Sequence, residues 1–390
     1  MKCLHAADIH IREKDIVEIE TCLNFLVETA AKENVDLVII AGDIFDSQEV
    51  KMASRSARLA VKTISALADI APVAIIKCTD SHDGNAPEIL SYARGRFSVY
   101  VATMPQQILL ADGILCATSP GKVRAVLTLI PQPSKQFFQT RAGIEGADQE
   151  IGQAMSALFG GFGAQAAVYP GVPHILAGHW NVNGCRLANG QIRTGMDIEV
   201  SVDQMNLGNF DIGCLGHIHV QQVLGGRYFY SGPIYATKID EDGPKGFYVH
   251  DLDTLSGVWE SRFIETPCKK MVRLSHDLTP VLTETEKSDL YYHEHGEVAG
   301  AHVRLDLTIW QDEAGTLDKQ EIEKHYLSLG AESADIRIIR VPRVTVRAES
   351  VLKAETLPDK IARMAEIRGE IVSAGVLVKA AEIENAQPAG

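Results

Sequence analysis

The sequence predicts an α/β protein with a large main domain, a small α+β unit and a terminal helix. Compact apolar runs typical of buried strands alternate with stretches in which apolar residues recur at helical spacing. Polar residues follow these strands directly, and in open α/β sheets ligands collect at the carboxyl ends of strands. The chain of 390 residues is also longer than one typical domain. We therefore expect a functional site formed by loops from several strands.

The composition is that of an ordinary globular protein. Hydrophobic residues make up 46% and charged residues 23% of the chain, and the mean hydropathy is near zero. The N-terminus lacks the continuous apolar segment of a secretory signal, and no apolar run has the length that a membrane span requires. We therefore expect a cytoplasmic protein that does not act at a membrane.

Cysteine usage and net charge limit the kinds of site the protein can have. The 7 cysteines are scattered and never form a C-x-x-C pair, which argues against a disulfide framework or a cysteine zinc site. The net charge of −14 argues against binding nucleic acid by bulk electrostatics alone. It does not exclude a nuclease, because carboxylates that hold divalent cations add to the negative total and bound cations reverse the local sign.

The main domain is expected to span residues 1–265. Its first helix is indicated by apolar residues at helical spacing, namely Ile16, Ile19, Leu23, Leu26 and Ala30. Its strands are expected at residues 3–7, 35–40, 72–76, 175–177 and 212–215. Residues 131–173 are a Gly- and Gln-rich insertion with a helix at about 148–159, followed by the glycine-rich residues 160–163.

Two smaller parts follow the main domain. Residues 266–345 combine a strand at 303–309, a helix at 318–329 and a strand at 336–339, which is an α+β pattern. Residues 346–390 contain a helix at about 358–374, whose start is indicated by Thr356-Leu357-Pro358-Asp359. The apolar stripe of this helix consists of Leu357, Ile361, Met364, Ile367 and Ile371. The stripe fits either docking on the chain's own domain or binding of a partner.

Five short motifs, each at the end of an apolar strand, contain the residues with the clearest chemical meaning. They are Asp8-Ile9-His10, Gly42-Asp43-Ile44-Phe45-Asp46, Ser81-His82-Asp83, Gly178-His179 and Gly216-His217-Ile218-His219. Any one of them alone is weak, because isolated pairs of this kind are mostly structural or accidental. Each histidine singly fits an ordinary core or surface position. The ordered set indicates one shared site.

Two divalent metal ions are the ligands that these residue types favour. The candidate residues are Asp8, His10, Asp43, His179, His217 and His219. Hydrolysis of a phosphodiester requires shielding of negative oxygens and a hydroxide-like nucleophile at neutral pH, and two ions roughly 3.5 to 4 Å apart supply both. We expect Asp43 to bridge the ions, because a carboxylate can give one oxygen to each. His217 and His219 point to the same side of an extended strand and can serve different ions. Mixed imidazole and carboxylate ligation suits Mn²⁺, Fe or Zn better than Mg²⁺ or Ca²⁺.

The five motifs, in this order, resemble those of the calcineurin-like metallophosphoesterases. The Gly-His-Ile-His motif, followed by Phe229-Tyr230-Ser231-Gly232-Pro233, is similar to the SbcD branch, the meiotic-recombination-eleven type of DNA-repair nuclease. The resemblance covers about the first 265 residues by motif, and the small unit that follows by order and size only. It implies a four-layer α-β-β-α sandwich and a small α+β capping domain that orients DNA.

The resemblance also implies which residues hold which ion. The first ion's ligands would be Asp8, His10, Asp43 and His219, and the second ion's would be Asp43, Ser81, His179 and His217. One position departs from the family. The family's third motif reads G-N-H-D or G-N-H-E, and Ser81 stands where its ligating asparagine is expected. A serine hydroxyl is a poorer ligand than an amide carbonyl. We therefore expect an asymmetric pair, in which the second ion binds more weakly, uses a water or recruits Asp80.

The activity that the resemblance implies is Mn²⁺-dependent cleavage of DNA. The protein would act as an exonuclease on DNA ends and as an endonuclease on hairpin or single-stranded DNA, and His82 would position the scissile phosphate or protonate the leaving oxygen. It would be the nuclease subunit of a complex with an SbcC-type coiled-coil ATPase, which would bind the C-terminal helix. A homodimer is implied as well.

A basic stripe follows the Asp43 motif. Lys51, Arg55, Arg58 and Lys62 fall at i, i+4, i+7 and i+11, on one face of an expected helix, and no acidic residue occurs from residue 50 to 68. The stripe indicates either contact with DNA phosphates or a solvated helix face. We favour DNA binding, because the helix follows the Asp43 loop.

Two other functions fit parts of the sequence. A metallophosphoesterase for small phosphate esters, cyclic nucleotides or phosphoproteins would share the metal site, although Asp46 is followed by Ser47-Gln48 and not by the Arg-Gly of protein phosphatases of this class. A DNA-tethering subunit would result if Ser81 had cost the chain its catalysis. We expect Asp46 to stabilise a turn, and residues 291–295 to form a solvated loop or edge strand rather than a second metal site.

Overall fold

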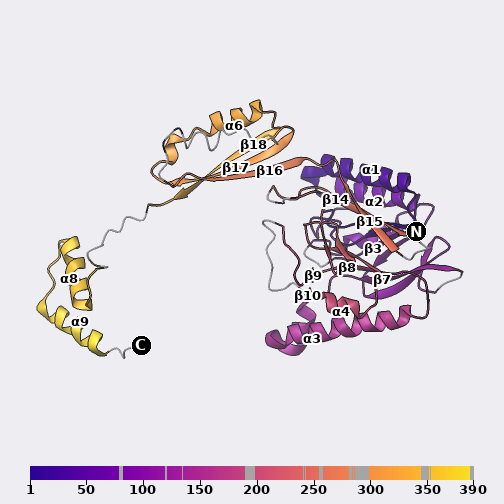
Figure 1. Ribbon diagram of the computed structural model, residues 1–390, viewed down its shortest axis with the longest axis horizontal. Helices are drawn as coiled ribbons and strands as arrows, with labels where there is room; N and C mark the ends of the chain where they lie inside the picture. The colour runs from indigo at the N-terminus through magenta and orange to yellow at the C-terminus, as the bar shows by residue number, and fades with distance from the viewer. Residues whose placement is uncertain are drawn as a thin grey trace. The chain divides into compact units, whose positions relative to one another are not determined.

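A computed structural model describes the fold of most of the chain. The described residues are 1–78, 82–118, 121–133, 135–188, 198–239, 241, 243–253, 258–280, 283, 285, 298–343, 351 and 353–386, without the side chains of 135–149, 253 and 386. They divide into a larger unit, Met1–Leu274 with His293–Leu305 and Glu321–Ile336, and a smaller unit, Ser275–Tyr292 with Asp306–Gln320 and Arg337–Gly390. The architecture is mixed α/β, as predicted (Figure 1).

A six-stranded sheet in the order β15-β14-β1-β2-β3-β4 contains the first strands of the chain. Its parallel members are β1 (Lys2–Ala6), β2 (Leu37–Ile40), β3 (Val73–Ile76) and β4 (Val99–Ala102). Its antiparallel members are β14 (Gly246–Asp253) and β15 (Val258–Glu265). The carboxyl ends of β1, β2 and β3 therefore lie at one edge of the sheet.

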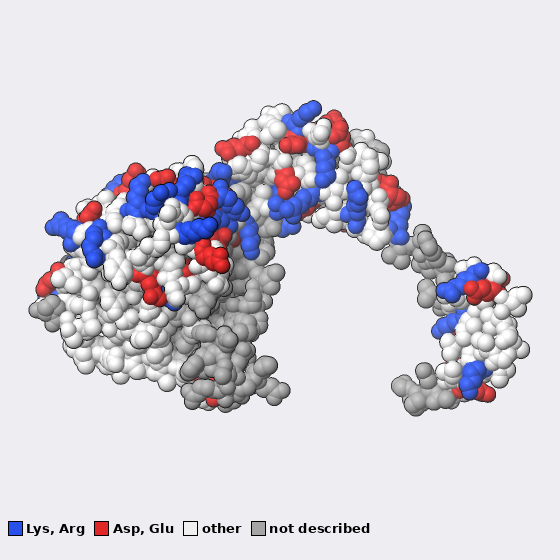
Figure 2. Space-filling view, turned by 180° about the vertical axis from the view of Figure 1, so that it is seen from behind, with Lys and Arg blue, Asp and Glu red and all other residues white. Residues whose placement is uncertain are grey.

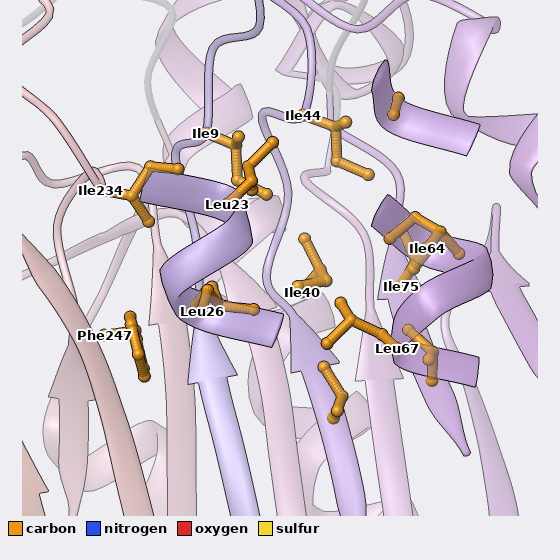
Figure 3. Close-up of a cluster of buried hydrophobic side chains, with 14 of the residues drawn as sticks. Ile9, Leu23, Leu26, Ile40, Ile44, Ile64, Leu67, Ile75, Ile234 and Phe247 are labelled. Carbon is orange, nitrogen blue, oxygen red and sulfur yellow. The ribbon is translucent and has the colours of Figure 1, made fainter. Parts of the chain in front are cut away.

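Two helices, α1 (Ile16–Glu33) and α2 (Arg55–Ala68), cover one face of this sheet. Figure 3 shows Leu26 of α1 and Leu67 of α2 in one apolar cluster with Ile40 of β2. Ile9 and Ile44 belong to the same cluster, although they lie in the loops that follow β1 and β2. The core thus anchors the two loops that carry the first two motifs.

A seven-stranded sheet in the order β12-β13-β11-β8-β7-β5-β6 packs against the first. Its parallel members are β7 (Val123–Ile130), β8 (His174–His179), β11 (Ile212–Gly216) and β13 (Tyr228–Tyr230). Its antiparallel members are β5 (Gln106–Ala111), β6 (Ile114–Cys116) and β12 (Gln222–Leu224). Leu37 and Ile39 of β2 share one buried cluster with Leu127 of β7 and Ile175 of β8, which shows that the sheets meet face to face.

The outer face of the second sheet packs on α3 (Lys135–Ala166) and α4 (Val202–Asn206). The helix expected at about 148–159 is longer than predicted at both ends, because it begins at Lys135 and continues through the glycine-rich residues 160–163 to Ala166. At one of these positions, close packing explains why the residue is glycine. A Cβ on Gly163 would come within 2.9 Å of the carbonyl oxygen of Leu207, so glycine allows α3 to lie close to the end of α4. A short two-stranded sheet, β9 (Asn181–Val182) with β10 (Glu199–Val200), lies after β8.

The remaining elements belong to the C-terminal part of the chain. A three-stranded sheet in the order β16-β17-β18 is formed by β16 (Lys270–Asp277), β17 (Ala301–Trp310) and β18 (Ser333–Val341), with α6 (Lys319–Ser328) between the last two in sequence. Two helices follow, α8 (Leu357–Arg368) and α9 (Ala374–Ala386). Short 3-10 helices are η1 (Glu13–Asp15), η2 (Ala86–Tyr92) and η3 (Ala314–Thr316).

The prediction of one terminal helix at about 358–374 was wrong at its carboxyl end. Gly369 adopts a left-handed conformation with φ 69° and caps α8, so the helix stops there. Ile371, the last member of the predicted apolar stripe, lies outside the helix and is 100% exposed. The second helix, α9, was not predicted.

Candidate metal centre

The loops after β1 and β2 hold Asp8, His10 and Asp43 in an unusual backbone conformation. Their φ values are 52°, 45° and 51°, in the left-handed region that residues other than glycine rarely adopt. Ile9 and Ile44, which lie next to these residues in the chain, are buried in the core and keep the two loops in place. Hydrogen bonds also join the two loops, from the Asp8 N–H to the Gly42 carbonyl (3.1 Å) and from the His10 N–H to the Asp43 carbonyl (2.9 Å). Core packing and hydrogen bonds therefore hold the loops of the first two motifs together.

His179, at the end of β8, is oriented by the loop after β2. Its Nδ1 donates a hydrogen bond to the carbonyl oxygen of Ala41 at 2.7 Å, which leaves Nε2 as the atom that faces the site. A Cβ on Gly42 would come within 2.4 Å of Nδ1, and a Cβ on Gly216 within 2.7 Å. The glycines of two motifs thus leave the space that the imidazole occupies.

His219 is oriented by a carboxylate that the motifs do not contain. Its Nδ1 donates to Oε1 of Glu241 at 2.6 Å. Glu241 is held in turn by the ammonium group of Lys245 at 3.2 Å and by the backbone N–H of Thr237 at 3.0 Å. Nε2 of His219 consequently faces Nε2 of His10, 3.2 Å away. A carboxylate on the outer nitrogen of an imidazole is the usual support of a metal-binding histidine.

A hydrogen bond between the two sheets places His217. Oδ1 of Asp8, after β1, accepts a hydrogen bond from the backbone N–H of His217, after β11, at 2.8 Å. His217 has a φ of 92°, and its ring lies edge-on to the ring of His179 with 5.2 Å between the centroids. The carboxyl ends of strands from both sheets therefore meet at one site.

Candidate ligand atoms form three groups at this site, one of which is His10, Asp46 and His82, and the other two meet at Asp43. Of these two, one is Asp8, His10 and His219, the other is Asp43, Cys78 and His179, and within each the ligand atoms lie within 4.8 Å of one another. Oδ2 of Asp43 lies 3.6 Å from Nε2 of His10 and 3.4 Å from Nε2 of His179. This position between the groups is the one that a bridging carboxylate requires.

Several buried polar atoms of the site make no hydrogen bond. Among them are Oδ2 of Asp8, Oδ1 of Asp43 and Nε2 of His179. Buried acceptors without a donor are unfavourable, and buried charges are normally paired or bound to metals. Divalent cations would supply the missing partner to both carboxylates and to the imidazole. The residues present therefore fit a pair of metal ions.

The electrostatics of the site follow from its burial and its histidines. Burial raises the pKa of Asp8 to about 6, although His179 and His219 act in the opposite direction. Burial acts in the same way on Asp43, but the nearby His179 and His10 outweigh it and hold the pKa of Asp43 well below its usual range. Burial lowers the pKa of His10 to about 3. At neutral pH the two aspartates are carboxylates and His10 is a neutral imidazole, the forms in which these groups bind metals.

Comparison with known proteins identifies the family. Residues 1–221 match the family model described as Calcineurin-like phosphoesterase. The chain belongs to the calcineurin-like phosphoesterases. This family binds divalent metals, in agreement with the donor set at the strand ends.

Relatives of this calcineurin-like phosphoesterase are nucleases and a DNA-repair protein by name. The chain is 26% identical over 384 residues to the SbcD subunit of the nuclease SbcCD from Escherichia coli, which covers 91% of this chain and 88% of that protein. It is 23% identical over 309 residues to the corresponding SbcCD nuclease subunit of Staphylococcus epidermidis, covering 75% and 78%. It is 36% identical over 88 residues to the DNA double-strand break repair protein Mre11 of Aeropyrum pernix, covering 21% of each. Within the described part of the chain, none of the helices has the length and apolar character needed to cross a bilayer.

The third motif brings His82 to the same site. Its ring lies edge-on to the ring of His10, with 5.0 Å between the centroids. The adjacent Asp83 is fully buried and accepts hydrogen bonds from the N–H groups of Phe45 (2.8 Å) and Cys78 (3.4 Å). Asp83 therefore ties the third loop to the second. Ser81 and Asp80, which were predicted to affect binding of the second ion, lie outside the described residues.

The four basic residues are exposed, but not all of them lie on one helix. Ser54 caps α2, which begins at Arg55, so Lys51 precedes the helix and the predicted spacing was wrong at that residue. Arg55, Arg58 and Lys62 lie on α2, and Lys62 forms an ion pair with Glu20 of α1 at 2.8 Å. Figure 2 shows Lys and Arg gathered at the end of the larger unit near α1 and α2, with acidic side chains among them.

Sequence reasoning missed three residues that the site uses. Glu241 lies in the acidic run 240–242, where no spacing marks it as the partner of a histidine. Asp83 is in a recognised motif, but its role appears only when the second and third loops meet. Cys78 lies in none of the five motifs, and the fold places it beside Asp43 and His179. Residues 291–295 lie outside the described part of the chain. Oδ1 of Asp46 lies 3.5 Å from Nδ1 of His10, and its Oδ2 lies 3.6 Å from Arg12. Its role in stabilising a turn stays a prediction.

Proposed function

We propose that this protein is a two-metal DNA nuclease, the nuclease subunit of an SbcCD-like repair complex. One observation carries the proposal: the Asp43 carboxylate lies between two groups of ligand atoms and has an oxygen without a hydrogen bond. Asp8, His10 and His219 would hold the first ion with Asp43. His179 and His217 would hold the second ion, again with Asp43, and Ser81 is the remaining family position.

The ions supply the electrostatic part of the chemistry when bound. A pair of divalent cations shields the negative phosphate oxygens and makes water a better nucleophile at neutral pH. The residues around them keep the donors fixed, because Ala41 and Glu241 each accept the outer N–H of a histidine and leave Nε2 directed at the site. Fixed donors of this kind need no reorganisation during the reaction.

His82 is the group we propose for the proton transfer. It lies beside His10, and its Nδ1 is buried without a hydrogen bond. An imidazole in this position is suited to hydrogen-bond the scissile phosphate and to protonate the departing oxygen, since histidine is a common general acid. Asp83 supports this role by fixing the loop that carries His82.

DNA is the proposed substrate, with DNA ends, hairpins and single strands as the cleaved forms. The names of the relatives support nuclease action, and the exposed Lys51, Arg55, Arg58 and Lys62 support phosphate contact next to the Asp43 loop. We propose Mn²⁺ as the ion of the first position, whose ligands are oxygen and imidazole nitrogen only. We also propose a four-layer α-β-β-α sandwich for residues 1–265, a DNA-orienting capping domain at 266–345, and a homodimer.

A coiled-coil ATPase of the SbcC type is the proposed partner. The names of two relatives describe a subunit of SbcCD, and the terminal helices α8 and α9 carry apolar side chains that a partner could cover. Met364, Ile367, Val376, Val378 and Ile383 are 36–60% exposed. We propose that these helices, within residues 346–390, form the docking segment.

Cleavage of end-labelled DNA tests the proposal. Native protein with Mn²⁺ should degrade duplex ends and cut hairpin and single-stranded DNA, more so with the ATPase partner present. Asp43→Asn and His82→Ala should each lower the rate by a factor of about 100 or more, in the range expected for general acid–base and electrostatic groups. Activity on a nitrophenyl phosphodiester without any on DNA would favour the small-ester function. Absence of all hydrolysis with intact DNA binding would favour the tethering function.

A further inference from the structure

The thiol of Cys78 lies inside the second group of ligand atoms. Cys78 follows β3 after a single residue, at the sheet edge where the second and third motifs meet. Its Sγ, a carboxylate oxygen of Asp43 and a ring nitrogen of His179 all lie within 4.8 Å of one another. The residue is only 4% exposed. A soft donor is therefore built into the position of the second ion.

Two further observations indicate that these groups converge on a ligand. Oδ1 of Asp43 and Nε2 of His179 are buried and make no hydrogen bond, while Nδ1 of His179 is committed to Ala41. The Cys78 thiol lies 2.8 Å from Oε1 of Gln132, in the loop after β7. The amide of a glutamine can be turned so that its N–H₂ group donates to a sulfur atom instead. Gln132 is thus able to support either the thiol or a thiolate.

We propose that Cys78 binds the second metal ion as a thiolate, in place of the asparagine that the family supplies from its third motif. The proposal rests on the proposed function, because it concerns the same pair of ions. On binding, the bond between sulfur and the ion forms, the S–H bond breaks, and the proton leaves to solvent. The second ion would then have one carboxylate, one thiolate and two imidazoles from Asp43, Cys78, His179 and His217.

This donor set changes which metal the second position selects. One sulfur with imidazole and carboxylate is a set that Zn²⁺ accepts in tetrahedral coordination. Thiolates favour Zn²⁺ and other soft or borderline ions over Mn²⁺, which prefers oxygen. The first position has no sulfur donor among the described residues, so it keeps its preference for Mn²⁺. The two positions should therefore differ in metal preference as well as in affinity.

The chain offers a matched control for a second buried thiol. Cys214 lies between the sheets with His5 and His250, and the ligand atoms of these three residues also lie within 4.8 Å of one another. His5 and Cys214 are not part of the proposed nuclease site. A sulfur signal from this cluster would respond to substitution of Cys214, and a signal from the proposed site to substitution of Cys78.

Cobalt titration of the full chain, stripped of metals beforehand, tests the proposal. Co²⁺ bound to a thiolate gives an intense charge-transfer absorption in the near ultraviolet, whereas Co²⁺ with nitrogen and oxygen ligands gives only weak visible bands. Native protein and Cys214→Ala should show the charge-transfer band, and Cys78→Ser should lose it while keeping the visible bands of the first ion. Circular dichroism of each variant checks that it is folded. X-ray absorption of the Zn²⁺ form should show a sulfur neighbour at about 2.3 Å, absent in Cys78→Ser.

The outcomes separate the failure of this inference from failure of the proposed function. In Cys78→Ser the affinity of the second site for Zn²⁺ should fall by at least about tenfold, the smallest effect expected from removing even a supporting residue. Binding of two Co²⁺ ions without the charge-transfer band, or a band that survives in Cys78→Ser, overturns the role of Cys78 and leaves the metal centre standing. Absence of any bound Co²⁺ overturns the metal centre and the inference with it.

Discussion

Glu241 accepts a hydrogen bond from Nδ1 of His219 across 2.6 Å, although it lies outside all five sequence motifs. The side chains of His219 and Glu241 are both largely buried. Nζ of Lys245 lies 3.2 Å from Oε2 of Glu241 and balances the charge of the carboxylate. The arrangement fixes the tautomer of His219 and makes Nε2 a stronger donor to a cation. The proposed metal centre therefore depends on a residue that sequence spacing does not mark.

Replacing Glu241 by glutamine should weaken metal binding without removing a ligand. The amide oxygen still accepts from His219, but the negative charge that raises the basicity of the imidazole is gone. We expect the affinity for the tighter Mn²⁺ ion to fall about 10- to 100-fold, as measured by calorimetric titration of metal-free protein. Glu260→Gln, an exposed residue on β15, is the matched control and should leave the affinity unchanged. Equal affinities in both variants would contradict the role of Glu241.

Replacing Asp8 by asparagine should stabilise the metal-free protein at neutral pH. Burial raises the pKa of Asp8 from 3.8 to about 6, so this group favours folding below about pH 4 and that contribution disappears as the pH rises through 6. At pH 7.5 the buried carboxylate destabilises the fold by on the order of 1–3 kcal/mol. Asparagine keeps an oxygen that can accept from the N–H of His217.

Thermal unfolding in the presence of a chelator measures this effect. Asp8→Asn should unfold at a higher temperature than native protein at pH 7.5, and the difference should shrink towards pH 4. Addition of Mn²⁺ should raise the unfolding temperature of native protein much more than that of the variant, because ligand binding stabilises only a folded state that holds the ligand. A variant that is less stable than native protein at pH 7.5 would rule out the destabilising carboxylate.

Gly42 should be intolerant of even a methyl group. Its φ is 87° and a Cβ would lie 2.4 Å from Nδ1 of His179. Gly171 has a φ of 75° with no atom within 4 Å of the Cβ position, so Gly171→Ala measures the cost of the backbone conformation alone, about 1–2 kcal/mol. Gly42→Ala should lose more stability than this in denaturant unfolding and should also bind Mn²⁺ more weakly. Similar losses in both variants would show that the approach to His179 is unimportant.

The basic residues near α2 should contribute to DNA affinity by binding phosphates. Substituting Lys51, Arg55 and Arg58 together by glutamine should weaken DNA binding and make the salt dependence shallower by up to about 0.9 for each phosphate that is no longer neutralised. Lys62→Gln is the internal control, because Lys62 already pairs with Glu20 and should contribute less. Fluorescence anisotropy at several salt concentrations gives both quantities. A salt dependence that is unchanged in the triple variant would mean a solvated surface rather than a DNA-binding one.

Much of the fold could be predicted because its signals are local. The strands β1, β2, β3, β8 and β11 are short, mostly apolar runs, and polar residues lie at their carboxyl ends or shortly after them. The alternation of Ile9 with Asp8 and His10 separates a core-facing side chain from two that face the site. Parallel strands bring their carboxyl ends to one edge, so Asp8 and Asp43 could be placed together from sequence alone.

The parts that sequence reasoning missed depend on contacts between distant segments. Cysteine is a residue type common in protein cores, and only the packing of the two sheets makes Cys78 a neighbour of His179. The carboxyl end of α3 was placed too early because Gly163 looks like a helix end, while in the fold it allows close packing on Leu207. The break after α8 had a local signal in Gly369, which is a common residue at helix ends, but the apolar Ile371 beyond it suggested that the helix continued.

The most direct test of a metal pair bridged by Asp43 is anomalous X-ray diffraction from crystals grown with Mn²⁺. Two anomalous peaks should lie roughly 3.5 to 4 Å apart, one beside His10 and His219 and the other beside His179 and His217, with the Asp43 carboxylate between them. The peak on the His10 side should be the stronger, since its ligands are all oxygen or nitrogen. A single peak in crystals supplied with both Mn²⁺ and Zn²⁺, or no peak in contact with Asp43, would contradict the account.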